Sequence, residues 1–356
     1  MAHSTKAPTG PVPETASPAS PQPPAERVND SERVAVPLSA PEAPPLAGVP
    51  ETGGVRKWFL DRLRRRQAVE PSPISPATVR EVHENAPATN AVRPPVIEFR
   101  NVTKTYGDGY TAIENISFHV DDLPGKGEFI TLLGPSGCGK STILRLIAGL
   151  APQHPATTGD VLISGAPVVG PGPDRGMVFQ DYIAFDNRSV LDNVAFGLEC
   201  QGVASDERYE RARKVIAQVG LDPDRDAHKY PHQLSGGMRQ RVAIAGTLIL
   251  RPKIILMDEP FGALDPSTRY RMQDLIVNLW RDLEATIFFV THSVEEAVYL
   301  GDRTMIFSPG PGRLLQQLEV PPPDRPAKAM QREPEFLEVV YAIKDMVEKL
   351  DASPKD

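Results

Sequence analysis

Hydrophobic and polar positions alternate between residues 112 and 120, which predicts a strand with one exposed face. Other short stretches are apolar at almost every position, a pattern typical of strands buried on both faces. Three such stretches stand out: 129–133, 254–257 and 286–290. The chain is therefore expected to contain both half-exposed and fully buried strands.

The hydrophobic period changes to that of a helix after the first buried strand. Between residues 141 and 150 the apolar side chains fall on one face of a helix, and Gly149 lies near its end. A second helical pattern covers 334–350, after a Pro-rich connection at 321–326. Buried strands that alternate with helices indicate an α/β fold, in which helices cover a parallel sheet.

Composition sets the beginning of the chain apart from the rest. Of the 38 prolines, 18 lie within residues 1–95, a segment that is also rich in Ala, Ser, Glu and Thr. Such a composition cannot bury enough apolar surface to offset the chain entropy, so we expect residues 1–94 to be a disordered Pro-rich tail. About 260 residues remain, which suffices for one large domain.

One basic segment, 55–68, interrupts this tail. Val55, Phe59 and Leu63 recur there at helical spacing among several arginines. Two interpretations are open: the segment is a solvated basic part of the linker, or it is a short amphipathic helix that contacts anionic lipid or a membrane partner.

Net charge and cysteine content exclude several classes of protein. The formal net charge is −7, whereas nucleic-acid binders usually carry a basic domain, so no nucleic-acid partner is expected. Cys138 and Cys200 are isolated and give neither a disulfide framework nor a zinc pattern. The chain has no run of 18 apolar residues, and its first residues lack the apolar core of a signal peptide. We expect a soluble or peripheral protein.

The strongest chemical signal is a glycine-rich loop between the first buried strand and the helix that follows. Residues 134–141 read GPSGCGKS and match the phosphate-binding pattern G-x-x-x-x-G-K-[ST]. Backbone N–H groups of such a loop surround phosphate oxygens, the lysine reaches the outer phosphates and the serine hydroxyl ligates Mg²⁺. The candidate nucleotide-binding residues are Gly134, Pro135, Ser136, Gly137, Cys138, Gly139, Lys140, Ser141 and Thr142.

Two adjacent carboxylates end the buried strand 254–257. Ligands in open α/β sheets bind at the carboxyl ends of the strands, so Asp258 is placed to hold Mg²⁺ directly or through water. Glu259 would then lie on the γ-phosphate side and polarise the attacking water.

The first two motifs indicate only a phosphate-binding protein, and a third motif is more specific. Residues 234–240 read LSGGMRQ, and with this motif the sequence resembles the ABC transporter ATPase family, whose signature is LSGGQ; Met238 departs from it. In that family the signature closes on the ATP held by a second subunit. The resemblance therefore implies a homodimer with two shared nucleotides, in which Ser235, Gly236 and Gly237 contact the partner's ATP.

The resemblance extends over about residues 96–318 and implies roles for four further residues. Tyr106 matches the aromatic residue that stacks on adenine, and Asp265 matches a dimer-contact aspartate. Gln180 matches the catalytic-site glutamine that senses Mg²⁺ and links to the membrane subunit. His292 matches the histidine that holds the γ-phosphate. The implied fold is a P-loop NTPase core with a parallel sheet, an antiparallel β subdomain and a helical signature subdomain, followed by a C-terminal extension at 319–356.

Two segments, 170–180 and 192–199, are similar to the nitrate, sulfonate and taurine importer branch, although 181–186 departs from it. This likeness implies an ATPase subunit that powers solute uptake from the cytoplasmic face of the membrane. Its partners would be an integral-membrane permease and, indirectly, a substrate-binding protein. A non-transport ABC ATPase is the alternative, but the repair type carries a long coiled-coil insertion before the signature and the translation type carries two ATPase domains. A small-molecule kinase would need neither 234–240 nor His292.

Overall fold

The computed structural model describes residues 93–123, 125–320 and 323–351, all within one compact unit of the chain. Almost all of the expected Pro-rich tail, including the basic segment 55–68, lies outside the described residues. Among the residues that are described, no helix has both the length and the apolar character needed to cross a membrane.

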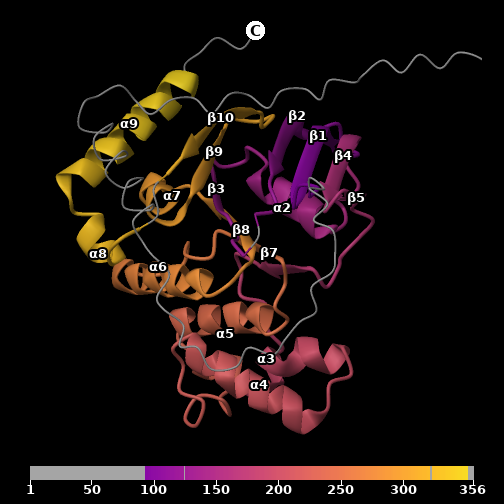
Figure 1. Cartoon of the computed structure of the whole chain (residues 1–356), viewed down its shortest axis with the longest axis vertical. Helices are drawn as coiled ribbons and strands as arrows, with labels where there is room; N and C mark the ends of the chain where they lie inside the picture. Colours follow the sequence, from indigo (N-terminus) through magenta and orange to yellow (C-terminus); the bar gives the residue numbers. More distant parts are fainter. Residues whose placement is uncertain (1–92, 124, 321–322, 352–356) are drawn as a thin grey trace, which may run out of the picture. The chain divides into compact units, whose positions relative to one another are not determined.

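The first sheet is antiparallel and has the strand order β2-β1-β4-β5 (Figure 1). Its long strands are β1 (Ile97–Thr105) and β2 (Thr111–Val120), which pair through a tight turn. On the other side, β1 pairs with β4 (Thr158–Ile163), which in turn pairs with β5 (Ala166–Pro167). The half-exposed strand predicted at 112–120 is confirmed as β2, with Ile116, Phe118 and Val120 all buried.

The second sheet is mostly parallel and has six strands. In spatial order these are β10 (Leu314–Glu319), β9 (Arg303–Phe307), β3 (Phe129–Leu133), β8 (Thr286–Thr291), β7 (Ile254–Asp258) and β6 (Arg175–Val178). Only β10 runs antiparallel to its neighbour. The three predicted buried strands are confirmed as β3, β7 and β8, which lie beside one another and are buried at every position.

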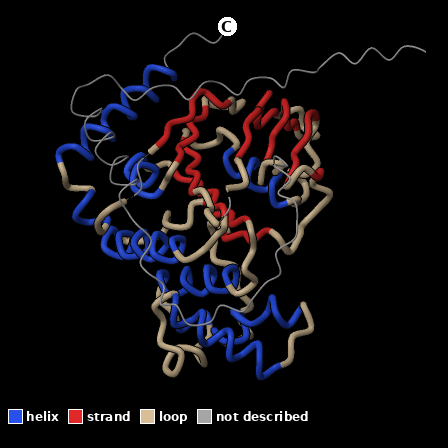
Figure 2. The backbone as a smooth tube through the Cα atoms, viewed as in Figure 1, coloured by secondary structure: helices blue, strands red, loops and turns tan. Residues whose placement is uncertain are grey.

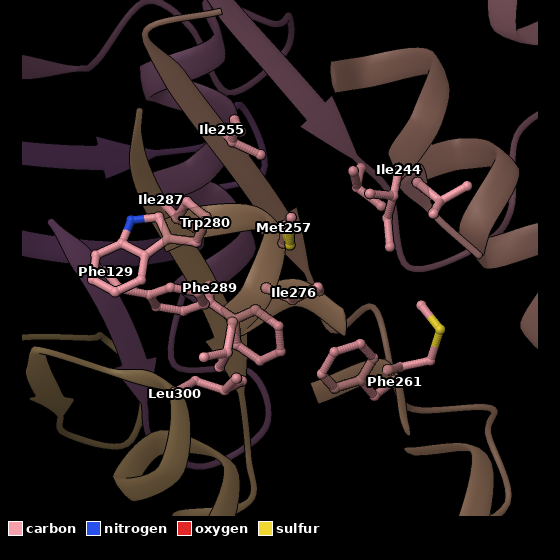
Figure 3. Close-up of a cluster of buried hydrophobic side chains, with 14 of the residues drawn as sticks. Phe129, Ile244, Ile255, Met257, Phe261, Ile276, Trp280, Ile287, Phe289 and Leu300 are labelled. Atoms are coloured by element: carbon pink, nitrogen blue, oxygen red, sulfur yellow. The ribbon is translucent and has the colours of Figure 1, made fainter. Parts of the chain in front are cut away.

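Successive residues of the buried strands point into two different hydrophobic clusters. In β7, Ile254 and Leu256 belong to a cluster with the antiparallel sheet and helix α2 (Lys140–Ala148). Ile255 and Met257 belong to the second cluster, with the other helices; Figure 3 draws them in this cluster together with Phe289 and the α6 residue Trp280. Helix α2 ends two residues earlier than predicted, because Gly149 adopts a left-handed conformation and caps it.

A helical region follows β6 and carries the signature (Figure 2). Its helices are α3 (Val190–Cys200), α4 (Ser205–Gln218) and α5 (Gly236–Leu248), which contact one another, and the short 3₁₀ turn η1 (Pro231–Gln233) precedes α5. A capping box between Ser189 and Asp192 begins α3. The antiparallel, mostly parallel and helical regions expected from the resemblance are thus all present.

The last helices pack into the same hydrophobic core as the buried strands β3, β7 and β8. Helix α6 (Pro266–Arg281) and helix α7 (Val294–Leu300) share the second cluster with α8 (Ala327–Met330) and α9 (Pro334–Asp351). The helix predicted at 334–350 is confirmed as α9. Its residue Phe336 is fully buried, so the C-terminal segment is part of the core rather than an appendage.

Candidate nucleotide site

The phosphate loop joins the end of β3 to the start of α2. Gly137 and Gly139 have φ angles of 80° and 86°, in the left-handed region that favours glycine. A Cβ at Gly139 would also lie 2.8 Å from the carbonyl oxygen of Ala112. Glycine is therefore required where the loop passes close to β2, which explains part of the sequence motif in steric terms.

Lys140 is buried at the first position of α2, with 5% of its surface exposed. Its Nζ donates hydrogen bonds to the carbonyl oxygens of Gly134 and Pro135, at 2.8 and 2.9 Å, and lies 3.6 Å from the Cys138 sulfur. These partners are a thiol and two carbonyls, none of which neutralises an ammonium charge. A buried cation at a helix N-terminus with such partners fits an anionic ligand such as a triphosphate.

Cys138 is fully buried inside this loop. Burial raises the pKa of its thiol, against the opposing effect of Lys140. A thiol that is held protonated is a poor nucleophile, so the geometry favours a packing role for this side chain.

Ser141 and Asp258 meet between α2 and the end of β7. The Ser141 hydroxyl donates a 2.7 Å hydrogen bond to Asp258 Oδ1, and Arg145 Nη2 lies 3.9 Å from Oδ2. Burial raises the pKa of Asp258, although Ser141 and Arg145 act in the opposite direction. A buried carboxylate next to a hydroxyl is an oxygen donor set that suits Mg²⁺. No group of three or more His, Cys, Asp or Glu able to hold a metal occurs within the described ranges.

Glu259 is brought together with Gln180 and His292, which follow two other strands of the sheet. Gln180 Nε2 donates a 3.5 Å hydrogen bond to Glu259 Oε2, and His292 Nδ1 lies 3.5 Å from the same oxygen. Glu259 has a φ of 45°, a left-handed conformation that costs a non-glycine residue energy. Strain of this kind at the edge of a sheet, beside a phosphate loop, is typical of a functional position.

Tyr106 lies next to the phosphate loop, as its predicted role requires. Its hydroxyl is 3.3 Å from the Thr142 hydroxyl in the first turn of α2. The structure adds two neighbours that the sequence analysis missed, Tyr110 and Arg145. Arg145 was hidden within an ordinary helical pattern, and the signal for Tyr110 was the second aromatic residue in the segment Tyr106–Tyr110.

The signature residues are not brought to this loop. Ser235 caps α5 by accepting a hydrogen bond from the Met238 N–H at 3.3 Å, and both Ser235 and Gly236 are exposed. No hydrogen bond or ion pair among the described residues joins Ser235 to the phosphate loop of its own chain. The exposed start of α5 is thus a second helix N-terminus suited to an anion, separate from the first.

Asp265 caps α6, the helix that lies against the signature. Its carboxylate accepts hydrogen bonds from Thr268 and Ser267, and these bonds hold the pKa of Asp265 well below its usual range. A Cβ at Gly237 would lie 2.8 Å from Thr268 Cγ2, so the glycine lets α5 and α6 approach closely.

A buried phosphate loop, a Ser–Asp pair, a strained glutamate and a separate Ser-Gly-Gly helix start together define an ATP-binding cassette. The sequence profile of the ABC transporter family matches residues 113–262. The chain belongs to the ABC transporter ATP-binding protein family, as its relatives also show.

Three curated relatives illustrate this membership. An uncharacterised ABC transporter ATP-binding protein of Methanocaldococcus jannaschii is 49% identical over 227 residues, which cover 63% of this chain and 82% of the relative. The nitrate import ATP-binding protein NrtD of Synechocystis is 46% identical, covering 63% of this chain and 84% of NrtD. The taurine import ATP-binding protein TauB of Burkholderia pseudomallei is 45% identical, covering 65% of this chain and 88% of TauB.

A solved structure has the same fold. The ATP-binding cassette MJ0796, in a dimeric post-hydrolysis state bound to ADP and Pi, matches with a TM-score of 0.55 and 32% sequence identity. The match covers 63% of this chain and 98% of that chain. The P-loop ATPase fold predicted from the sequence is therefore confirmed.

Proposed function

We propose that this chain is the ATP-hydrolysing subunit of an ABC importer and works as a homodimer bound to a membrane permease. The observation that carries the proposal is the buried Lys140 ammonium, which has only neutral hydrogen-bond partners and lies beside the Ser141–Asp258 pair. The nitrate and taurine import proteins among the relatives favour import over a non-transport ABC ATPase.

The phosphate loop binds and orients the triphosphate. Lys140 and the N-terminal N–H groups of α2 hold the outer phosphates, while the Ser141 hydroxyl and, directly or through water, Asp258 would hold Mg²⁺. When bound, Mg²⁺ neutralises charge on the β- and γ-phosphates. Tyr106 receives the adenine ring, as the resemblance implies.

Glu259 accepts a proton from the attacking water. Its carboxylate is held from two sides, by the Gln180 amide and by the His292 ring, each 3.5 Å away. These contacts fix the position of one carboxylate oxygen of Glu259. A positioned base of this kind contributes about 10²–10⁴-fold to a reaction rate. His292 is also the residue that holds the γ-phosphate, and Gln180 would report the presence of Mg²⁺.

The second subunit completes each ATP site. Ser235, Gly236 and Gly237 are placed at a helix start that is open to a partner, and Asp265 begins the neighbouring helix. Each chain would hold one ATP on its phosphate loop and cover the partner's γ-phosphate with its signature. The dimeric state of the solved relative MJ0796 supports this arrangement.

The segment 181–189 would transmit the nucleotide state to the permease. It follows Gln180 directly and exposes two large apolar side chains, Ile183 at 67% and Phe185 at 43%. We infer from these two exposed side chains that the segment contacts another protein. The permease would hold the subunit peripherally on the cytoplasmic face of the membrane, and a substrate-binding protein would deliver a nitrate-, sulfonate- or taurine-like solute.

Phosphate release from Mg-ATP by the purified chain tests the ATPase assignment. Lys140→Ala should abolish activity through loss of nucleotide affinity, whereas Lys253→Ala, at an exposed lysine, should leave it unchanged. Equal activity of the two variants would exclude the phosphate loop as the site.

The transport assignment has its own test. Replacing Ile183 and Phe185 together by Ser should reduce ATP-driven uptake by the assembled transporter far more than ATP binding. Val169→Ser, at a residue that is 91% exposed outside this segment, serves as the control. Equal loss of uptake and of ATP binding would mean that 181–189 has only a structural role.

A further inference from the structure

A tight turn between β1 and β2 presents two tyrosines next to the phosphate loop. Tyr106 N–H donates to the Tyr110 carbonyl at 2.8 Å, and Gly109 N–H donates to the Tyr106 carbonyl at 2.9 Å. Gly109 has a φ of 84°, which allows the turn to close. The two rings are nearly parallel, with an interplanar angle of 13° and centroids 6.3 Å apart.

Both tyrosine hydroxyls are anchored to the nucleotide site. Tyr110 donates a 3.2 Å hydrogen bond to the carbonyl oxygen of Gly137 in the phosphate loop. The Tyr106 hydroxyl lies 3.3 Å from that of Thr142. Lys104 Nζ lies over the Tyr106 ring, 5.6 Å from its centroid.

Tyr110 lies outside the hydrophobic core. Its exposed fraction is 51%, and neither hydrophobic cluster of the described residues includes it. The two phenylalanines of this hairpin, Phe99 and Phe118, are buried and stack on each other. A half-exposed aromatic ring that is held by a hydrogen bond from its hydroxyl is suited to contact a ligand.

We propose that Tyr110 is a second nucleoside-contacting residue, which forms with Tyr106 an aromatic surface that holds the base of the nucleotide. This inference rests on the ATP site proposed above. The Tyr110 ring would stack on the base, while its hydroxyl keeps the ring in register with the phosphate loop through Gly137. The contact would act on nucleosides and not on the phosphate chain.

Calorimetric titration of the full-length protein with Mg-ATP and with Mg-tripolyphosphate, which lacks a base, tests the proposal. Tyr110→Ala should weaken ATP binding roughly fivefold or more, the scale of a base–aromatic stack, and change tripolyphosphate binding less than about twofold. Tyr110→Leu, which keeps apolar bulk, should behave like Tyr110→Ala. Tyr110→Phe keeps the ring and loses only the hydrogen bond to Gly137, so it should lose less ATP affinity than Tyr110→Ala. Tyr341→Ala, at another exposed tyrosine, is the matched control and should change nothing.

Three results would overturn the proposal: wild-type ATP affinity in both Tyr110→Ala and Tyr110→Leu, equal loss for ATP and tripolyphosphate, or a loss in Tyr110→Phe as large as in Tyr110→Ala. The second and third would mean that Tyr110 only supports the loop. Lys140→Ala tests the phosphate site independently of Tyr110, because it should lose affinity for both ligands. If Lys140→Ala binds both normally, the proposed phosphate site fails, whatever Tyr110 does.

Discussion

Replacing Glu259 by Gln removes one negative charge and little else. The side chain keeps its length, and an amide oxygen can still accept from Gln180 and from His292, which lie 3.5 Å from the carboxylate oxygen. An amide cannot take a proton from water at neutral pH. Hydrolysis should therefore fall on the order of 10²-fold or more, which corresponds to at least about 2.7 kcal/mol of transition-state stabilisation.

ATP binding should survive this substitution, because Lys140, Ser141 and the loop backbone are unchanged. Single-turnover phosphate release measures the chemical step, and a separate nucleotide titration measures affinity. Glu284→Gln, at an exposed glutamate away from the site, is the control for the change of charge. Hydrolysis by Glu259→Gln within about threefold of the wild-type rate would refute the role of Glu259 as a base, since such a residue contributes far more.

Other substitutions test the strain, the electrostatics and the packing. Because the backbone at Glu259 is left-handed, Glu259→Gly should be more stable than Glu259→Ala by about 1 kcal/mol in free energy of unfolding, measured with denaturant. Both variants should be inactive. Equal stability would mean that the strain is absent. Burial raises the pKa of Asp258, so the folded protein binds this proton more tightly than the unfolded chain and loses stability as the pH rises through the raised pKa. Without nucleotide, Asp258→Asn should therefore melt at a higher temperature than the wild type near pH 7 and by a smaller margin near pH 4; a margin that grows on acidification would contradict this. Phe336→Ala should cost about 3–5 kcal/mol of stability in urea unfolding, because Phe336 is fully buried, whereas Tyr341→Ala on the exposed side of α9 should cost little; a neutral Phe336→Ala would contradict a shared core.

Local hydrophobic period was sufficient to predict the strands that are buried on both faces. The stretch 129–133 is β3, and 254–257 misses only Asp258, the polar end of β7. The order of the six strands could not be predicted, because it depends on contacts between segments far apart in the chain. Helix α4 escaped prediction because only Ala212 and Ile216 are buried along its 14 residues, which leaves a weak apolar face.

In the candidate site, too, the features formed by consecutive residues could be predicted, whereas those formed by residues far apart in the chain could not. The glycine loop could be identified from consecutive residues, because its backbone geometry requires glycine at fixed positions. The meeting of Gln180, Glu259 and His292 is a consequence of strand order, since each follows a different strand of the sheet. The roles taken from the family resemblance remain predictions, and Tyr110 became visible only through the geometry of its turn.

Two chains are expected to assemble around ATP, and size-exclusion chromatography of Glu259→Gln with saturating Mg-ATP measures this assembly. Glu259→Gln should form a stable dimer, because unhydrolysed ATP would keep each signature closed on the partner's γ-phosphate. Ser235→Arg in the same background should leave only monomer, since the exposed helix start could no longer receive phosphate oxygens. A monomer of Glu259→Gln at saturating ATP, or a dimer that Ser235→Arg does not disturb, would contradict an ATP site shared between two chains.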